Sequence, residues 1–243
     1  MAAIIPARYG STRFPGKPLA SQTGKPLIRH VYEAVSAARR IDRVIVATDD
    51  ERIAAAVRAF GGQAVMTRAD HATGTDRIAE VARSLEAGLI VNVQGDEPEM
   101  DPAHIDRLVA VMEQRPEAAM GSLACRFSRV EDVLNPACVK VVLDGDGFAL
   151  YFSRSVIPYP RDDGGRPADP GRWLLHLGIY AYRPDFLQRL TRASPVESEV
   201  LERLEQLRAL HLGARIAMAV VERHSSGIDT PEQYAAFVRR WRE

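Results

Sequence analysis

Three cationic side chains stand close together near the N-terminus, directly after a short apolar run. The run ends at Pro6, and Arg8, Arg13 and Lys17 follow it among two glycines and small hydroxyl residues. Glycines let the backbone approach an anion closely, and hydroxyl and backbone N–H groups donate hydrogen bonds to its oxygens. The three cations offset its negative charge. This loop therefore predicts a site for a polyanion, and a triphosphate fits that chemistry.

The loop lacks both common phosphate-binding signatures. Pro18 follows Gly16-Lys17, which excludes the G-x-x-x-x-G-K-[ST] pattern, and the loop contains no G-x-G-x-x-G pattern. A nicotinamide-dependent dehydrogenase would share a doubly wound core but needs the glycine fingerprint, so the sequence disfavours it. The alternative for the loop itself is a basic surface segment that binds nothing.

A candidate metal ligand follows a buried run at residues 89–93. The string Gln94-Gly95-Asp96-Glu97-Pro98 comes at the carboxyl end of this expected strand, where Gly95 permits a tight turn. Mg²⁺ prefers carboxylate, phosphate and water oxygens, so Asp96 is the first candidate. Glu97 is expected to face elsewhere, because neighbours on an extended chain point to opposite sides. The alternative for Asp96 is a turn residue with a solvated carboxylate.

These residues need a scaffold that gathers strand ends at one edge. Short apolar runs alternate with stretches of helical periodicity, which indicates an α/β fold with a doubly wound, mostly parallel sheet. In such sheets ligands bind beyond the carboxyl ends of the strands. Strands are expected at residues 43–48, 63–66, 89–93, 120–125, 173–182 and 216–221, besides the first run.

The alternation changes in the second half of the chain. Residues 139–143 and 148–152 flank a turn of Asp and Gly residues and predict an antiparallel β-hairpin. Residues 196–210 are expected to form one helix. Thr75 or Asp76 is a candidate cap for an earlier helix, and Asp229 is a candidate cap for the last one.

Composition excludes several classes of protein. The 243 residues contain 32 basic and 32 acidic side chains, so the net charge is zero and no nucleic-acid footprint is indicated. No apolar run approaches the roughly 18 to 20 residues of a membrane span. Cys125 and Cys138 stand in no metal or redox spacing and are expected to be buried thiols in a reducing cytosol. The sequence thus indicates a cytoplasmic protein of one domain, residues 1–243, with no membrane partner.

Several strings resemble one enzyme family. The N-terminal loop is similar to the pyrophosphate loop of cytidylyltransferases that activate acidic sugars, and the family it resembles most is 3-deoxy-manno-octulosonate (Kdo) cytidylyltransferase. The matching strings are Ile4–Leu19, Val91–Pro98, Tyr151–Arg154, His176–Tyr180 and Leu204–Arg208.

The resemblance implies a reaction and its participants. It implies a nucleotide-diphospho-sugar transferase-like fold and transfer of a cytidylyl group from CTP to Kdo with Mg²⁺, giving CMP-Kdo and pyrophosphate for lipopolysaccharide synthesis. It also implies a homodimer, with residues from about 136 to 183 as a sugar-binding and dimerisation subdomain. A covalent nucleotidyl intermediate is not expected, since no Ser/His/Asp or Cys/His arrangement is present.

The same resemblance assigns roles to individual residues. Arg8, Lys17 and Asp96 are expected to be catalytic, and Asp96 and Asp229 to hold the metal. CTP is expected to contact Arg8, Ser11, Arg13, Lys17, Thr73, Gly74, Arg77 and Gln94. The sugar is expected to contact Gln94, Arg154, His176, Tyr180, Glu205 and Gln206, with Glu202 as the alternative to Glu205.

Three alternatives remain open at this point. A cytidylyltransferase for 8-amino-Kdo, a nonulosonic acid or a phosphonate would keep the same N-terminal half. A non-catalytic binding protein would keep the fold but release no pyrophosphate. For His176 and Tyr180, considered alone, the alternative is that they are buried polar residues whose hydrogen bonds are made within the core.

Overall fold

The computed structural model describes residues 1–10, 13–222 and 227–242, and the chain divides into two compact units. Unit 1 comprises Met1–Asp106 and Ser225–Glu243, and unit 2 comprises Arg107–His224. Helix α4 (Pro102–Gln114) contains the boundary between them in the sequence. The unit boundary differs from the expected subdomain of residues 136–183, which falls entirely inside unit 2.

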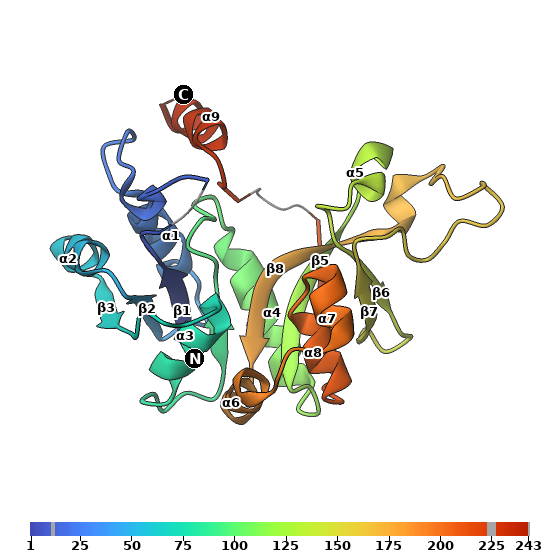
Figure 1. Ribbon diagram of the computed structural model, residues 1–243, viewed down its shortest axis with the longest axis horizontal. Helices are drawn as coiled ribbons and strands as arrows, with labels where there is room; N and C mark the ends of the chain where they lie inside the picture. Colours follow the sequence, from blue (N-terminus) through green and yellow to red (C-terminus); the bar gives the residue numbers. More distant parts are fainter. Residues whose placement is uncertain (11–12, 223–226, 243) are drawn as a thin grey trace. The chain divides into compact units, whose positions relative to one another are not determined.

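Unit 1 is built on a parallel sheet with the strand order β3-β2-β1-β4, of which Figure 1 labels β3, β2 and β1. Side chains of β1, β2 and β4 are almost all buried, as apolar runs covered on both faces require. The chain moves outward from β1 to β3 and then returns to pair β4 with the other edge of β1. This reversal is a topological switch point, where open α/β sheets bind ligands. The strands are β1 (Ala2–Ala7), β2 (Arg43–Thr48), β3 (Gln63–Met66) and β4 (Ile90–Asn92).

Local capping explains where the helices of unit 1 begin. Asp50 caps α2 by accepting a hydrogen bond from the backbone N–H of Arg52. The cap of α3 is Thr73, so the prediction of Thr75 or Asp76 at that position is wrong. Asp76 instead completes a capping box by accepting from the Thr73 N–H. The helices are η1 (Lys17–Leu19), α1 (Leu27–Ser36), α2 (Glu51–Ala59), α3 (Gly74–Ala82) and α9 (Pro231–Arg242).

The C-terminal helix α9 packs back onto the first residues of unit 1. Tyr234 and Phe237 form a buried cluster with Leu27 of α1 and Ile228, and Phe14 packs against this cluster. The phenol oxygen of Tyr234 accepts a hydrogen bond from the backbone N–H of Gln22 at 2.9 Å. Residues from both ends of the sequence therefore share one core, which fixes the segment before α9 against the N-terminal loop.

Unit 2 has a mixed sheet around the buried strand β5. This strand pairs in parallel with β9 and antiparallel with β8. The predicted hairpin is confirmed, since β6 and β7 pair antiparallel and β6 also pairs with β8 (Figure 1). The strands are β5 (Met120–Arg126), β6 (Lys140–Leu143), β7 (Ala149–Ser153), β8 (Leu174–Tyr182) and β9 (Ile216–Val221).

The helix expected at residues 196–210 is two helices, so that prediction is wrong. Arg203 interrupts it with a left-handed backbone conformation (φ 53°). The carboxylate of Glu202 accepts hydrogen bonds from Ser153 Oγ and the Arg154 N–H, so contacts with β7 stabilise the break. The helices of unit 2 are α5 (Val130–Leu134), η2 (Pro170–Arg172), α6 (Pro184–Arg192), α7 (Glu197–Glu202) and α8 (Gln206–His211).

The observed elements confirm the expected α/β class with a mostly parallel sheet. None of the helices in the described ranges combines the length and the apolar composition that a membrane span requires.

Candidate active site

A polar pocket lies at the carboxyl ends of β1 and β4, the two strands that meet at the switch point. It is a cavity of about 250 Å³ within unit 1. The residues around it come from four segments that are far apart in the sequence. They are Pro6, Ala7, Arg8, Arg13, Lys17, Pro18, His71, Thr73, Gly74, Arg77, Gln94, Gly95, Asp96 and Asp229.

A glycine and an aromatic ring shape the turn in the loop after β1. Gly16 has a φ of 70°, a left-handed conformation that favours glycine, and its N–H donates to the carbonyl of Tyr9 at 3.0 Å. The Tyr9 ring lies against the Gly16 backbone, and the Arg52 guanidinium stacks on that ring at 3.4 Å. This turn places Lys17 at the start of η1. Ser11, a predicted CTP contact, lies outside the described residues.

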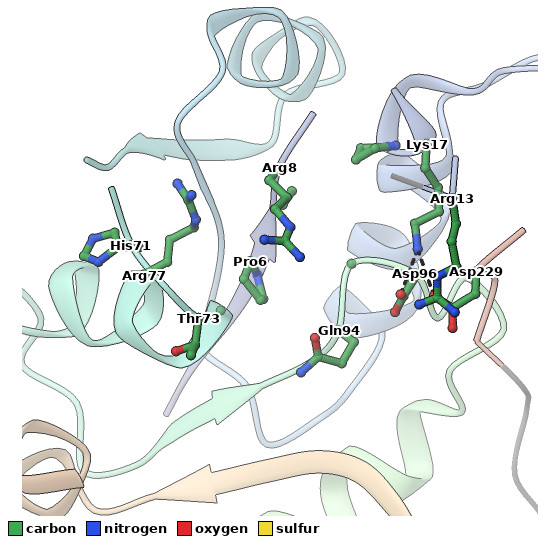
Figure 2. A pocket seen from close by; sticks show the side chains of 14 residues that line it. Pro6, Arg8, Arg13, Lys17, His71, Thr73, Arg77, Gln94, Asp96 and Asp229 are labelled. Carbon is green, nitrogen blue, oxygen red and sulfur yellow. Dashed lines mark hydrogen bonds and ion pairs between the residues drawn. The ribbon is translucent and has the colours of Figure 1, made fainter. Parts of the chain in front are cut away.

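Lys17 lies between two carboxylates. Its Nζ is 2.8 Å from Asp96 Oδ2 and 3.7 Å from Asp229 Oδ1, and it donates to the Ile228 carbonyl at 2.6 Å. The Lys17 side chain is only 12% exposed. Figure 2 shows these three side chains pointing toward one another, with Arg13 beside Asp229. The structure thus brings together an ammonium and two aspartates that are more than a hundred residues apart.

The carboxylate of Asp229 is not used as a helix cap. Thr230 takes that role, because its hydroxyl accepts from the Gln233 N–H at 3.3 Å while Gln233 Oε1 accepts from the Thr230 N–H at 3.0 Å. Asp229 instead forms ion pairs with Lys17 and, at 3.2 Å, with Arg13. The cap interpretation of Asp229 is therefore wrong, and its carboxylate faces the pocket.

The two aspartates form a donor set that fits a divalent cation. Both present oxygens to the same positive charge, the ammonium of Lys17, so their negative potentials converge at one place. Mg²⁺ takes about six oxygen ligands and is commonly held by one or two carboxylates plus phosphate oxygens and water. No group of three or more His, Cys, Asp or Glu side chains suited to a metal occurs in the described part of the chain. The donor set thus suits a cation shared with a bound phosphate rather than a closed protein site.

Arg8 and Arg13 extend the positive side of the pocket. Both residues are exposed, and both line the cavity that Lys17 enters. In the view of Figure 2, Arg8 lies between the group formed by Lys17, Asp96 and Asp229 and the wall that carries His71 and Arg77. Guanidinium groups at an open pocket can bind phosphate oxygens in a bidentate manner.

The opposite wall belongs to helix α3 and the loop before it. The buried Arg77 guanidinium donates to Thr67 Oγ1 and pairs with Asp49 Oδ2 at 3.0 Å, so its position is fixed by the ends of β2 and β3. Gly74 brings the first turn of α3 close to Pro6, since a Cβ there would lie 3.4 Å from the proline ring. His71, whose ring nitrogen contacts Glu80, also lines the pocket.

The loop after β4 approaches β1 closely. A Cβ on Gly95 would lie 2.8 Å from the carbonyl oxygen of Pro6, so only glycine fits there without movement. Gln94 lines the pocket and donates to Asn92 Oδ1 at 3.2 Å. Burial, with a smaller effect of the Asp96 charge, raises the pKa of Glu97 to about 7. The sequence indicated only that Glu97 points away from Asp96; its partial burial depends on the tertiary structure.

Apart from Gln94 of unit 1, the residues predicted to contact the sugar lie in unit 2, and three of them gather there. His176 and Tyr180 of β8 have ring centroids 5.5 Å apart, and the Tyr180 hydroxyl is 3.4 Å from Gln206 Oε1. Burial lowers the pKa of His176 to about 3, so the ring is neutral near pH 7. Gln206 Nε2 is buried with no hydrogen-bond partner among the described residues. A buried amide donor of this kind stabilises a site only when a ligand or water accepts from it.

Arg154 and Glu202 form a structural contact within unit 2. The guanidinium of Arg154 donates to the carbonyl oxygens of Glu202 at 2.6 Å and Pro136 at 2.9 Å. The Glu202 carboxylate is occupied by Ser153 and the Arg154 N–H. The carboxylate of Glu202 thus already has two partners within unit 2.

Comparison with known proteins gives consistent matches. The cytidylyltransferase family profile matches residues 2–216. A 3-deoxy-manno-octulosonate cytidylyltransferase of Geobacter sulfurreducens is 51% identical over 237 residues, which are 95% of each chain. Its counterpart in Syntrophotalea carbinolica is 53% identical over 239 residues, which are 96% of this chain and 94% of the relative.

Solved structures agree with these sequence matches. A CMP:2-keto-3-deoxy-manno-octonic acid synthetase complexed with CTP superposes with a TM-score of 0.92 at 43% identity, over 98% of this chain and 97% of that one. A 4-diphosphocytidyl-2C-methyl-D-erythritol synthase from Anaerococcus prevotii has a TM-score of 0.65 at 11% identity, over 100% of this chain and 98% of that one, a likeness of fold alone.

Proposed function

The chain belongs to the 3-deoxy-manno-octulosonate cytidylyltransferase family, and we propose that it is a nucleotidyltransferase that activates Kdo with CTP for lipopolysaccharide synthesis. The observation that carries this proposal is the pocket in which Lys17 lies between Asp96 and Asp229 while Arg8 and Arg13 line the same cavity. Three cations and two converging carboxylates suit a nucleoside triphosphate bound together with a metal ion.

The reaction is a phosphoryl-type transfer. The anomeric hydroxyl of Kdo attacks the α-phosphorus of CTP, the bond from that phosphorus to the bridging oxygen breaks, and CMP-Kdo and pyrophosphate form as the hydroxyl proton leaves. Such transfers need positioning and charge neutralisation more than covalent catalysis. We assign Arg8, Arg13 and Lys17 to the β- and γ-phosphates, where they stabilise the charge of the leaving pyrophosphate.

Cytidylyltransferases generally use a divalent metal ion, and we propose Mg²⁺, with Asp96 and Asp229 as its protein ligands. When bound, the ion would withdraw charge from the α-phosphate and lower the pKa of the sugar hydroxyl. The two aspartates themselves hold Lys17 in place, so the ammonium is oriented before the nucleotide binds.

The base and ribose of CTP are assigned to the other wall of the pocket, with Thr73, Gly74, Arg77 and Gln94 as the contacts and Ser11 as a further contact to the phosphates. Support comes from the placement of Thr73, Gly74, Arg77 and Gln94 around one cavity. Asp49 and Thr67 hold the Arg77 guanidinium, so it offers a fixed surface rather than a mobile charge.

For the sugar we propose Arg154, His176, Tyr180, Glu205 and Gln206 of unit 2, together with Gln94. The buried donor of Gln206 supports this assignment, because a sugar oxygen could accept from it. Residues 136–183 remain our proposal for the sugar-binding and dimerisation subdomain. The exposed apolar side chains of Leu150 (58%) and Tyr151 (40%) on β7 support a homodimer formed through the hairpin.

We also propose that the enzyme works in the cytoplasm, where CTP is made. Cys125 and Cys138 are free thiols in the structure, which agrees with a reducing compartment.

The test is pyrophosphate release from CTP and Mg²⁺ with a panel of acceptors: Kdo, 8-amino-Kdo, a nonulosonic acid and a phosphonate. Release is expected with Kdo as the preferred acceptor and with CTP as the preferred nucleotide. Asp96→Asn should reduce kcat by at least about 100-fold, because it removes a charge at the reacting phosphate.

A matched control is Asp42→Asn. It changes an exposed carboxylate just before the amino end of β2, whereas the pocket lies at the carboxyl ends of the strands of the same sheet. This variant should keep wild-type kinetics. Folded wild-type protein that releases no pyrophosphate with any acceptor, or an Asp96→Asn variant as active as Asp42→Asn, would contradict the proposal.

A further inference from the structure

Strands β5 and β8 of unit 2 contain an irregularity beside the residues assigned to the sugar. Ser122 pairs with Tyr180, but the next residue of β5, Leu123, pairs with Leu177. Two residues of β8, Gly178 and Ile179, are therefore skipped by the ladder. Bulges of this kind re-aim side chains and are common next to active sites.

The Ser122 hydroxyl stabilises this bulge from inside. Ser122 is fully buried, and its Oγ lies 2.8 Å from the carbonyl oxygen of Ile179 and 3.1 Å from that of Leu177. The hydroxyl thus supplies a donor at the place where the regular ladder is interrupted. The same Oγ lies 3.0 Å from His176 Nε2.

The number of hydrogens on the Ser122 hydroxyl decides which of these groups donates and which accepts. A serine hydroxyl carries one hydrogen, and a carbonyl oxygen can only accept. The hydroxyl hydrogen is therefore directed to the Leu177 and Ile179 carbonyls, and the contact with His176 requires that Nε2 carry a proton and donate. Burial keeps the ring neutral, since it lowers the pKa of His176 to about 3. A neutral imidazole protonated at Nε2 has an unprotonated Nδ1, which is an acceptor.

The neighbouring groups complete a pattern of donors and acceptors. The His176 ring packs edge-on against Phe152, with centroids 4.9 Å apart, and at a tilt against Tyr180, whose hydroxyl contacts Gln206. Gln206 contributes a buried donor that has no partner in the described part of the chain. An acceptor at Nδ1 and a donor at Gln206 Nε2 suit a ligand rich in hydroxyl groups, because each hydroxyl both donates and accepts.

We propose that Ser122 is a positioning residue for the acceptor sugar: it holds His176 as the Nε2-protonated tautomer, so that Nδ1 accepts a hydrogen bond from a sugar hydroxyl. This inference rests on the proposed function, which places the sugar beside His176. Ser122 itself is too deeply buried to contact a ligand, so it acts through His176 and through the bulge that carries Tyr180.

The first measurement is independent of catalysis. In the wild-type protein labelled with ¹⁵N at histidine, the chemical shifts of His176 are expected to show a protonated Nε2 and an unprotonated Nδ1 between pH 6 and 8, a range chosen around the usual histidine pKa of about 6.5. In Ser122→Ala the ring should lose this single tautomer. A wild-type ring protonated at Nδ1 overturns the inference.

The second measurement is kinetic. Ser122→Ala should raise KM for Kdo by about tenfold, a factor typical of one lost hydrogen bond, and leave KM for CTP within about twofold. The same substitution in a His176→Phe background should have little further effect on KM for Kdo, since the residue through which it acts is gone. Thr191→Val is the matched control, because it removes another hydroxyl of unit 2 that donates to a backbone carbonyl, that of Leu187.

The outcomes separate the inference from the function on which it rests. A folded Ser122→Ala variant with an unchanged KM for Kdo, or with KM for Kdo and CTP raised equally, overturns the role of Ser122 while the proposed function stands. Wild-type protein that releases pyrophosphate only with another acceptor overturns the choice of Kdo, and KM for that acceptor then tests Ser122 in the same way. If Ser122→Ala fails to fold, the tautomer of the wild-type ring still decides the inference.

Discussion

Replacing Gly95 by alanine tests whether the close approach of two loops sets the geometry of the site. The added methyl group would lie 2.8 Å from the carbonyl oxygen of Pro6, whereas ordinary van der Waals contact begins at 3.4 Å, a shortfall of about 0.6 Å. Pro6 belongs to β1, which pairs with β2 in a buried parallel ladder. The strand cannot move easily, so the loop that carries Asp96 has to move.

A shift of this size is large for the site. Asp96 Oδ2 lies 2.8 Å from Lys17 Nζ, and a displacement of half an ångström or more would weaken that contact. Overpacking in a tight backbone contact costs about 1–3 kcal/mol of folding free energy. A misplacement on the order of 1 Å can cost about 100-fold in rate, so we expect kcat/KM for CTP to fall by about 10- to 100-fold.

The assay is pyrophosphate release under saturating Kdo, together with thermal unfolding of the same preparation. Gly88→Ala is the matched control, because Gly88 lies just before the same strand, β4, and a Cβ there meets nothing within 4 Å. This control should keep wild-type activity. A Gly95→Ala protein with both kcat/KM and melting temperature like those of Gly88→Ala would refute the reasoning.

Three other substitutions make independent predictions. Lys17→Met should lower kcat/KM for CTP by at least about 100-fold, because it leaves Asp96 and Asp229 without the cation that they share. Its control is Lys25→Met, since Lys25 stands in a second Gly-Lys-Pro-Leu string but pairs with Glu33, and similar losses in both variants would contradict the role of Lys17. Glu199→Leu should destabilise the protein to urea by about 3–5 kcal/mol, since it removes the carboxylate that pairs with the buried Arg208 guanidinium. Arg58→Ala, which removes an exposed pair with Glu51, should move the urea midpoint little, and equal shifts of the two variants would count against the argument. Burial, together with the positive charge of Lys25, lowers the pKa of His30 from 6.5 to about 4. Between pH 6.5 and pH 4 the unfolded state therefore binds a proton at this ring that the folded state does not bind. Stability from this group is present above pH 6.5 and is lost toward pH 4, so His30→Gln should reduce the slope of unfolding free energy against pH by about 1.4 kcal/mol per unit there; urea titrations with an unchanged slope would refute it.

Local features of the chain could be predicted because their causes are local. The apolar runs that became β1, β2 and β4, the cap at Asp50 and the β6–β7 hairpin follow from periodicity, side-chain hydrogen bonding and turn chemistry within a few residues. The predictions failed where distant contacts decide. The helix expected at 196–210 breaks at Arg203 because Glu202 binds Ser153, the last residue of β7, and Arg154, which follows it.

The amino-acid sequence by itself determined the α/β class, the anion-binding character of the N-terminal loop and the candidacy of Asp96, since these depend on residue type and on order along the strand. Only the tertiary structure decided that Asp229 faces Lys17 while Thr230 caps the helix, that Glu97 is partly buried, and that Ser122 reaches His176. The physical reason is that hydrogen bonds and ion pairs act over about 3–4 Å, so their partners are chosen by packing rather than by position in the chain.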